Sequence, residues 1–420
     1  MSKTVLLLGS GGKEHAWALA LIKSNANIIT WAPKINPGIK EISIGVLEAP
    51  YNRNERLLDE WLNQIDLVII GQTSPSLEGI GDWLEEFGIE VFSPSAKNTL
   101  IEASKSYMRK FITRNEINGN IDYVICSSES DVKSYLDKSL EVAVKPDGLT
   151  GGNGVRVFGD HLKSKEEILE YAKLLISNDG KVVIEEIVKG VEFSLQGFAN
   201  GEQIVFLPLV KDYKRAFNGD KGPNTASMGS CSFTNHTLPY LSDNHLIEAK
   251  QIMKDVLKAL KKENGDYKGA IYGQFMITED GPKIIEFNAR MGDPEAFNIF
   301  AILETPILDL IDSLSTNSID NQTVKFTKSA TCALYLVPEG FPENTQIGQH
   351  ISIPSGIENN FRIAYVDKIN GKYITTKKRS FVIVGTGETI SEARENVYNI
   401  IPKNFDGIRY RTDIGLEYEI

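Results

Sequence analysis

The segment Ile284-Ile285-Glu286-Phe287-Asn288-Ala289-Arg290 does most to decide the fold of this chain. Its polar residues recur at every second position, which is typical of a strand whose side chains alternate between two faces. Glu286, Asn288 and Arg290 then share one face. A carboxylate beside an amide oxygen suits Mg²⁺, and a guanidinium suits a carboxylate or a phosphate. The segment predicts a site for metal-bound phosphates, with a solvated strand face as the alternative.

A hairpin is expected around this strand. Residues 271–277 and 282–287 flank Glu279-Asp280-Gly281, a sequence that favours a tight turn between antiparallel strands. Gln274 would lie on the partner strand, where its side chain could add a third oxygen ligand.

A glycine-rich loop precedes the hairpin in the chain. It reads Lys145-Pro146-Asp147-Gly148-Leu149-Thr150-Gly151-Gly152-Asn153-Gly154, between predicted strands at 141–145 and 155–158. Its free amides could close over phosphates as a mobile lid, and Lys145 could supply a fixed positive charge. A flexible connector explains the loop equally well.

Two further stretches carry candidate binding residues. The predicted strand 181–187 contains Glu185 and Glu186, with Glu192 shortly after, so it could offer backbone to an adenine edge and acids to ribose hydroxyls; an ordinary strand with exposed acids is the alternative. Residues 211–225 form a polar stretch much longer than a connection needs, and its Lys211-Asp212-Tyr213-Lys214-Arg215 holds three cations. These cations favour an anionic substrate; the alternative is that the stretch is an ordinary surface loop.

The N-terminus predicts a doubly wound α/β domain. An apolar strand at 4–9, the turn Gly9-Ser10-Gly11-Gly12 and a helix at 14–24 are its usual opening, and the free amides of the turn could hold an anion. Glu14 stands where a dinucleotide fingerprint needs glycine, which disfavours NAD. Strands are also expected at 27–31, 67–70 and 89–92, and helices at 54–64 and 77–87.

Composition limits the classes of function. The chain has 420 residues with a net charge of −11, 41% hydrophobic and 24% charged residues, which indicates a globular protein of about three domains. It has no long basic run, apolar span or signal-peptide core, so we expect no nucleic-acid or membrane partner. The three cysteines, Cys126, Cys231 and Cys332, are odd in number and widely separated, which indicates reduced thiols and a cytoplasmic location.

Three domains are expected. Residues 1–100 form the parallel α/β domain, residues 101–325 an α+β body with mostly antiparallel strands, and residues 326–420 a small α+β domain. Within the body, residues from about 120 to about 190, which include the glycine-rich loop, would form a lid subdomain.

Taken together, Lys145 with its glycine loop, the Glu185-Glu186 strand and Glu286-Phe287-Asn288-Ala289-Arg290 resemble the ATP-grasp ligases. With Gly9–His15, Gly222-Pro223-Asn224-Thr225 and the motifs of the last block, the chain is similar nearly end to end to the phosphoribosylamine–glycine ligase family.

The resemblance implies a central ATP-grasp fold, and ATP-dependent joining of glycine to 5-phosphoribosylamine through glycyl phosphate, in purine biosynthesis. It implies ATP as co-substrate and Mg²⁺ or Mn²⁺, two ions, as cofactor, in a monomer or weak homodimer. The implied ATP-binding residues are Lys105, Lys145, Gly151, Gly152, Glu185, Glu186 and Glu192. The implied metal ligands are Gln274, Glu286 and Asn288. The implied catalytic residues are Arg290, Asp212 and Lys214, and the implied substrate-binding residues are Gly11, Gly12, Lys214, Arg215, Pro223, Asn224 and Arg290.

Several positions depart from the family pattern. Asn153 stands in place of a usual lysine and Tyr213 in place of a usual histidine, while Gln72-Thr73-Ser74-Pro75 and Ala226-Ser227 replace other usual residues. Two alternatives therefore stay open: an ATP-grasp ligase for a different acid and amine, and a weakly catalytic nucleotide-binding relative.

Overall fold

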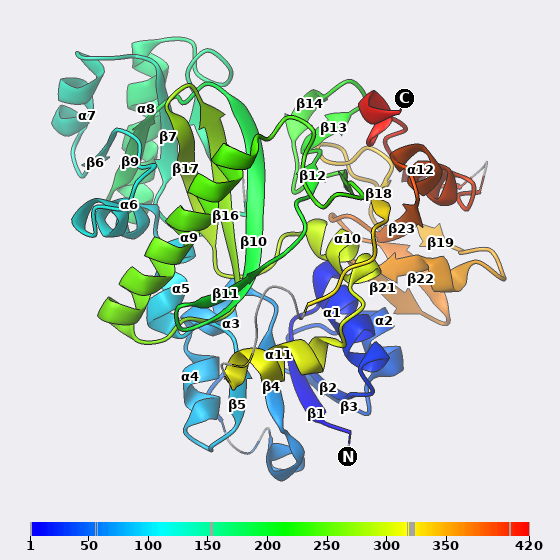
Figure 1. The fold of residues 1–420 in the computed structure, drawn as a ribbon. Helices are drawn as coiled ribbons and strands as arrows, with labels where there is room; N and C mark the ends of the chain where they lie inside the picture. The colour runs from blue at the N-terminus through cyan, green and yellow to red at the C-terminus, as the bar shows by residue number, and fades with distance from the viewer. Residues whose placement is uncertain are drawn as a thin grey trace.

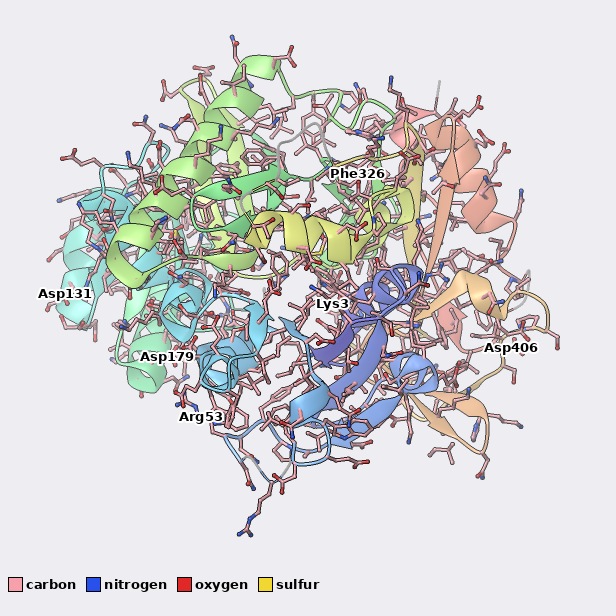
Figure 2. All side chains as sticks on the ribbon, turned by 60° about the horizontal axis from the view of Figure 1, so that its bottom comes forward. Lys3, Arg53, Asp131, Asp179, Phe326 and Asp406 are labelled. Carbon is pink, nitrogen blue, oxygen red and sulfur yellow. The ribbon has the colours of Figure 1, made fainter. Side chains whose placement is uncertain are left out.

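A computed structural model describes residues 2–54, 56, 58–151, 154–316, 318, 324–402 and 405–419. The predicted fold class is confirmed: an N-terminal parallel α/β unit, a central antiparallel sheet with a lid subdomain, and a C-terminal α+β unit (Figure 1). The lid and the C-terminal unit lie at opposite ends of the molecule, as Asp131 and Asp406 mark in Figure 2. Among the described residues, no helix combines the length and the apolarity that a membrane span requires.

The N-terminal unit is a five-stranded parallel sheet in the order β3-β2-β1-β4-β5. Its strands are β1 (Thr4–Leu8), β2 (Asn27–Ala32), β3 (Gly45–Glu48), β4 (Leu67–Ile70) and β5 (Glu90–Phe92). Its helices are α1 (Gly12–Lys23), α2 (Pro37–Ile42), α3 (Thr73–Leu77), α4 (Ile80–Glu85) and α5 (Ala96–Ala103). The strand order reverses between β1 and β4, which is where such sheets usually bind ligands.

The central unit is a four-stranded antiparallel sheet in the order β11-β10-β16-β17. Its strands are β10 (Val191–Asn200), β11 (Gln203–Phe206), β16 (Lys268–Thr278) and β17 (Gly281–Asn288), and its helices are α6 (Lys105–Arg114) and α9 (Asp243–Asn264). The predicted hairpin is confirmed: β16 and β17 pair directly, and Gln274 is the register partner of Glu286.

The lid subdomain is a small sheet in the order β6-β9-β7-β8, covered by two helices (Figure 1). Its strands are β6 (Tyr123–Cys126), β7 (Val142–Pro146), β8 (Arg156–Val157) and β9 (Val182–Glu186), and its helices are α7 (Glu129–Leu136) and α8 (Lys165–Asp179). The subdomain has its own buried apolar cluster, which explains how it folds as a separate layer.

The C-terminal unit is built on a six-stranded sheet in which β12-β15-β18-β23-β20 are consecutive neighbours and β24 also pairs with β18. Its strands are β12 (Lys211–Asp212), β15 (Gly229–Ser232), β18 (Ala330–Pro338), β20 (Phe361–Ile363), β23 (Phe381–Gly387) and β24 (Ile408–Arg409). Smaller sheets contain β13 (Arg215–Phe217) with β14 (Lys221–Asn224), and β19 (His350–Ile351) with β21 (Val366–Ile369) and β22 (Lys372–Thr375). The helices are α10 (Glu295–Ile302), α11 (Ile307–Ser315) and α12 (Ile390–Tyr398). Lys3 before β1 pairs with Asp312 of α11, next to which it lies in Figure 2.

Two predicted helices of the N-terminal unit differ in the structure: that at 54–64 is wrong, and that at 77–87 is shorter than expected. The described part of 54–64 contains turns and short 3₁₀ segments, among them Leu62–Gln64, so tertiary context overrides the helical spacing of Leu58, Trp61 and Leu62. The helix expected at 77–87 is found in shorter form as α4, which begins after Gly79 in a left-handed conformation with φ of +72°, and the separate helix α3 precedes it.

Candidate active site

One cavity of about 500 Å³ receives residues from every unit of the fold. Eleven residues selected from the sequence line it: Lys105, Lys145, Gly151, Glu192, Asp212, Lys214, Asn224, Gln274, Glu286, Asn288 and Arg290. Gly152 and Asn153 lie outside the described residues. These eleven residues alone are spread over 185 positions of the chain, from Lys105 to Arg290.

The end of β17 presents an ordered row of polar groups. Glu286 lies opposite Gln274 across the hairpin, and the Asn288 amide donates to Oε1 of Glu286 at 3.4 Å. Arg290 donates in turn to Oδ1 of Asn288 at 3.1 Å. The register between β16 and β17 shifts just after Gln274, and this bulge sets the direction in which Glu286 leaves the strand.

The oxygen atoms of this row fit a hard cation. Glu286 supplies a carboxylate, and Asn288 and Gln274 supply amide oxygens, the donor types that Mg²⁺ takes when phosphates complete its coordination. Within the described ranges, no cluster of three or more His, Cys, Asp or Glu side chains has a metal-binding arrangement. A metal here would therefore depend on the amide oxygens and on its substrate for ligands.

Two lysines face this row from α6 and from the lid. The Lys105 ammonium donates to the carbonyl of Gly148 in the glycine loop at 3.0 Å. Burial lowers the pKa of Lys105, against the attraction of Glu286. Nζ of Lys145 lies 2.5 Å from Oε2 of Glu185. Both lysines line the cavity at the mouth of the glycine loop, where phosphate oxygens would need them.

Glu185 is an internal counter-ion in this arrangement. Its side chain is 1% exposed, and its Oε1 lies 2.7 Å from Nε of the fully buried Arg109. Burial alone would raise the pKa of Glu185, but Arg109 and Lys145 outweigh it and lower the pKa to about 2. The carboxylate is therefore occupied on both oxygens by cations of the protein.

The other two predicted adenosine-binding acids differ in position. Glu186 is exposed, and its carboxylate accepts from the Asp122 amide at 2.9 Å, so its side chain is turned toward β6. Glu192 lines the cavity and forms an ion pair with Lys214. Of the two carboxylates, that of Glu192 is the one in reach of a bound molecule.

The cavity wall carries a cluster of ionisable side chains, those of Asp212, Lys214 and Glu295. Burial raises the pKa of Asp212, against the attraction of Lys214, and Oδ1 of Asp212 is buried with no hydrogen-bond partner among the described residues. Burial opposes the charge of Lys214, but Glu192 and Asp212 outweigh it and raise its pKa. Burial and the charge of Asp212 raise the pKa of Glu295 to about 7. The buried Oδ1 of Asp212 can therefore accept a hydrogen bond from the cationic group of a bound molecule.

The hairpin of β13 and β14 closes an adjoining cavity of about 440 Å³, which shares Asp212 and Lys214 with the first. Arg215 and Asn224 line this second cavity, whereas Pro223 is not among its described lining residues. Arg411 fixes the hairpin from the C-terminal unit, because it donates to the Arg215 carbonyl at 3.0 Å and to Asp220 at 2.8 Å.

The first glycine turn is filled by the protein itself. The Gly11 amide donates to Oε2 of Glu14 at 2.7 Å, and a Cβ on Gly12 would meet the Tyr335 hydroxyl at 2.8 Å. Neither glycine is among the described lining residues of the cavity, although Lys13 is. The turn that the sequence offered as an anion site therefore packs against Glu14 and the C-terminal unit.

Sequence reasoning missed several buried charges at the site. Asp293 lies 3.1 Å from Arg379 and accepts from the Tyr335 hydroxyl at 2.5 Å, and Glu102, Arg109 and Glu295 are likewise buried against site residues. Asp293 and Glu295 lie only three and five positions after Arg290, and this proximity was the available signal. Glu102, Arg109 and Arg379 carry no local signal in the sequence, because their partners are distant in the chain.

Three family models match the chain in order. The phosphoribosylglycinamide synthetase N domain matches residues 3–102, its ATP-grasp (A) domain residues 103–296, and its C domain residues 331–417. The chain belongs to the phosphoribosylglycinamide synthetase family. As a member of an ATP-grasp ligase family it uses ATP. The domain boundaries expected near residues 100 and 325 stay predictions.

Relatives of this phosphoribosylglycinamide synthetase family member match over nearly the whole chain. A phosphoribosylamine–glycine ligase of Methanococcus vannielii is 41% identical over 98% of this chain and 96% of its own length. That of Pyrococcus furiosus is 37% identical, over 99% and 95% respectively. The crystal structure of the Thermotoga maritima ligase has a TM-score of 0.83 at 29% identity, covering 98% of this chain and 100% of its own. The biotin carboxylase domain of Hydrogenobacter thermophilus 2-oxoglutarate carboxylase, at 14% identity and a TM-score of 0.73, shares the fold alone.

Proposed function

We propose that this chain joins glycine to 5-phosphoribosylamine in the cytoplasm, as a monomer or weak homodimer, forming glycinamide ribonucleotide, ADP and phosphate. The observation that carries the proposal is the cavity in which Lys105, Glu286 and Arg290 meet, in a chain 41% identical to a phosphoribosylamine–glycine ligase. A carboxylate is a poor electrophile, so the cavity has to turn its oxygen into a leaving group.

The reaction has two steps that balance. A carboxylate oxygen of glycine bonds to the γ-phosphorus of ATP, and ADP leaves. The amine nitrogen of 5-phosphoribosylamine then bonds to the carbonyl carbon of glycyl phosphate, phosphate leaves, and the nitrogen loses a proton. Both steps place negative charge on phosphate oxygens, and fixed cations stabilise that charge without reorganising.

Each group in the cavity has a part that suits its chemistry. Lys105 and Lys145 bind phosphate oxygens, since both ammonium groups lie beside the glycine loop. Arg290 orients the glycine carboxylate through its planar fork. The unpartnered Oδ1 of Asp212 receives the glycine ammonium, with Lys214 balancing the charge. Positioning of this kind lowers the barrier by holding the reacting atoms in contact.

Glu286, Asn288 and Gln274 would hold Mg²⁺ or Mn²⁺, two ions with the substrate phosphates as further ligands. When bound, these ions neutralise charge on the transferring phosphoryl group. The side chains that hold them are fixed by the β16–β17 register and by the hydrogen bond from Arg290 to Asn288.

Phosphate release tests the proposal. The purified chain is supplied with ATP and Mg²⁺, and glycine and freshly prepared 5-phosphoribosylamine are added singly and together. Turnover that needs both substrates supports the proposed reaction, and tight ATP binding without turnover on any substrate contradicts it.

A different acid and amine pair is the second candidate. Gln72, Thr73 and Ala226, which depart from the family pattern, all line the cavity. Turnover with other acids or amines, but not with glycine and 5-phosphoribosylamine, would favour this candidate.

A further inference from the structure

Arg109 is a fully buried arginine at the junction of the lid, helix α6 and strand β17. It is not among the described residues that line the cavity. Its Nε lies 2.7 Å from Oε1 of Glu185 in β9, and its two terminal nitrogens donate to the carbonyls of Ile284 and Ile285 at 3.0 and 3.2 Å. A fourth acceptor, Oδ1 of Asn120, lies 3.1 Å from Nη1 of Arg109. A buried guanidinium is costly unless its N–H groups donate hydrogen bonds, and most of those of Arg109 do.

These contacts connect the two halves of the phosphate site. On one side, Ile285 directly precedes Glu286, the carboxylate of the predicted metal site. On the other side, Glu185 holds Arg109 with one oxygen and Lys145 with the other, at 2.7 and 2.5 Å. Arg109 thus reaches Lys145 only through Glu185.

The charges of Arg109, Glu185 and Lys145 do not cancel. Arg109 and Lys145 carry two positive charges, and the Glu185 carboxylate, which the lowered pKa keeps ionised, carries one negative charge. One positive charge is left over, and of the two cations only Lys145 lines the cavity. Without Arg109, Glu185 would neutralise Lys145 completely, and buried charges interact strongly at such distances.

We propose that Arg109 is a positioning residue that keeps the positive charge of Lys145 available to a nucleotide phosphate, by taking up one oxygen and half of the charge of Glu185. The inference rests on the proposed function, because it assumes that the cavity binds ATP. It also assigns Glu185 the role of an internal counter-ion instead of a contact with adenosine.

Binding of a non-hydrolysable ATP analogue with Mg²⁺, measured by calorimetry, tests this role in four proteins: the wild type, Arg109→Met, Arg109→Met combined with Glu185→Gln, and Arg114→Gln. We expect Arg109→Met to weaken binding by about tenfold, the effect of losing one charge-assisted contact. The double variant restores the single positive charge on Lys145, and we expect its affinity to return to within about threefold of the wild type. Arg114 lies on the same helix in an exposed ion pair with Glu263, so Arg114→Gln should bind like the wild type.

The double variant separates this role from a structural one. Arg109→Met and the double variant lose the same hydrogen bonds to Ile284 and Ile285, so a purely structural arginine predicts no recovery. Wild-type affinity in Arg109→Met, or a double variant that binds no better than Arg109→Met, overturns the inference. If Arg109→Met does not fold, Arg109→Gln replaces it in both proteins with the same expectations. A wild type that binds no nucleotide would instead contradict the proposed function.

Discussion

Glu102 and Arg290 meet where the N-terminal and central units join, with 3.4 Å between Oε1 of Glu102 and Nε of Arg290. The same carboxylate accepts from the Thr73 hydroxyl at 2.9 Å and from the Ala289 amide at 2.8 Å. Arg290 also donates to the Met291 carbonyl and to Asn288. The guanidinium is therefore held in one orientation, so the direction in which its planar face of N–H donors points is fixed at the site.

Replacing this planar group should impair the reaction of glycine. Arg290→Lys keeps the charge but loses the fork, so we expect kcat/KM for glycine to fall by about 100-fold, while the affinity for a nucleotide changes little. Steady-state phosphate release at varied glycine measures this. A fall of less than about threefold would show that Arg290 does not orient the carboxylate.

Glu286→Gln should abolish turnover and leave the fold intact. The amide retains the shape of the side chain but removes the one negative charge of the predicted ligand set, which a divalent cation needs. Phosphate release with both substrates, and the melting temperature, measure the two parts. The matched control is Glu186→Gln, an exposed acid in the lid whose carboxylate contacts the Asp122 amide, and it should retain near-normal turnover. Near-normal activity of Glu286→Gln would contradict the metal assignment.

Local patterns were sufficient for the parts of the site that lie on one strand pair. The alternation in β17 and the turn at Glu279-Asp280-Gly281 predicted the hairpin, and with it the pairing of Gln274 with Glu286. Both features depend on neighbours within about fifteen residues, where strand geometry fixes the outcome.

The remaining contacts depend on long-range packing. Arg109 looks like one more polar residue of an amphipathic helix, and only its contact with Glu185, 76 positions away, shows that it is buried. The first glycine turn does not form the expected anion site. Its amides look free in the sequence, but the Glu14 carboxylate accepts from the Gly11 amide, and its glycines pack closely against Tyr335 and Tyr365. A pattern can show that a group could bind an anion, but not which group of the protein already does.

The stability of the protein should respond to pH through Glu295. Its pKa is raised to about 7 by burial and by Asp212, with Lys214 and Arg290 opposing the shift, whereas an unfolded glutamic acid titrates near 4.3. The native state therefore binds more protons than the unfolded state between these values, and stability falls as pH rises through this range. Glu295→Gln removes this loss, so its melting temperature relative to the wild type should increase between pH 5 and pH 8. A constant difference across that range would show that Glu295 is ionised throughout in the native state.

His15 should give the opposite pH dependence at the interface of the N- and C-terminal units. Its Nδ1 accepts from the Ile363 amide at 2.8 Å, and burial with the charge of Arg362 lowers its pKa to about 4. The unfolded histidine titrates near 6.5, so the native state binds fewer protons between these values, and the stabilisation present above pH 6.5 is lost as pH falls toward 4. The loss is about 2 kcal/mol between pH 7 and pH 5, because it begins near the unfolded pKa of about 6.5 and amounts to about 1.4 kcal/mol for each pH unit below it. His15→Asn keeps an acceptor that does not titrate, so its unfolding free energy, measured with urea, should depend less on pH over this interval. If the two proteins lose stability in parallel, His15 is not the group that titrates, whatever the absolute cost of the smaller side chain.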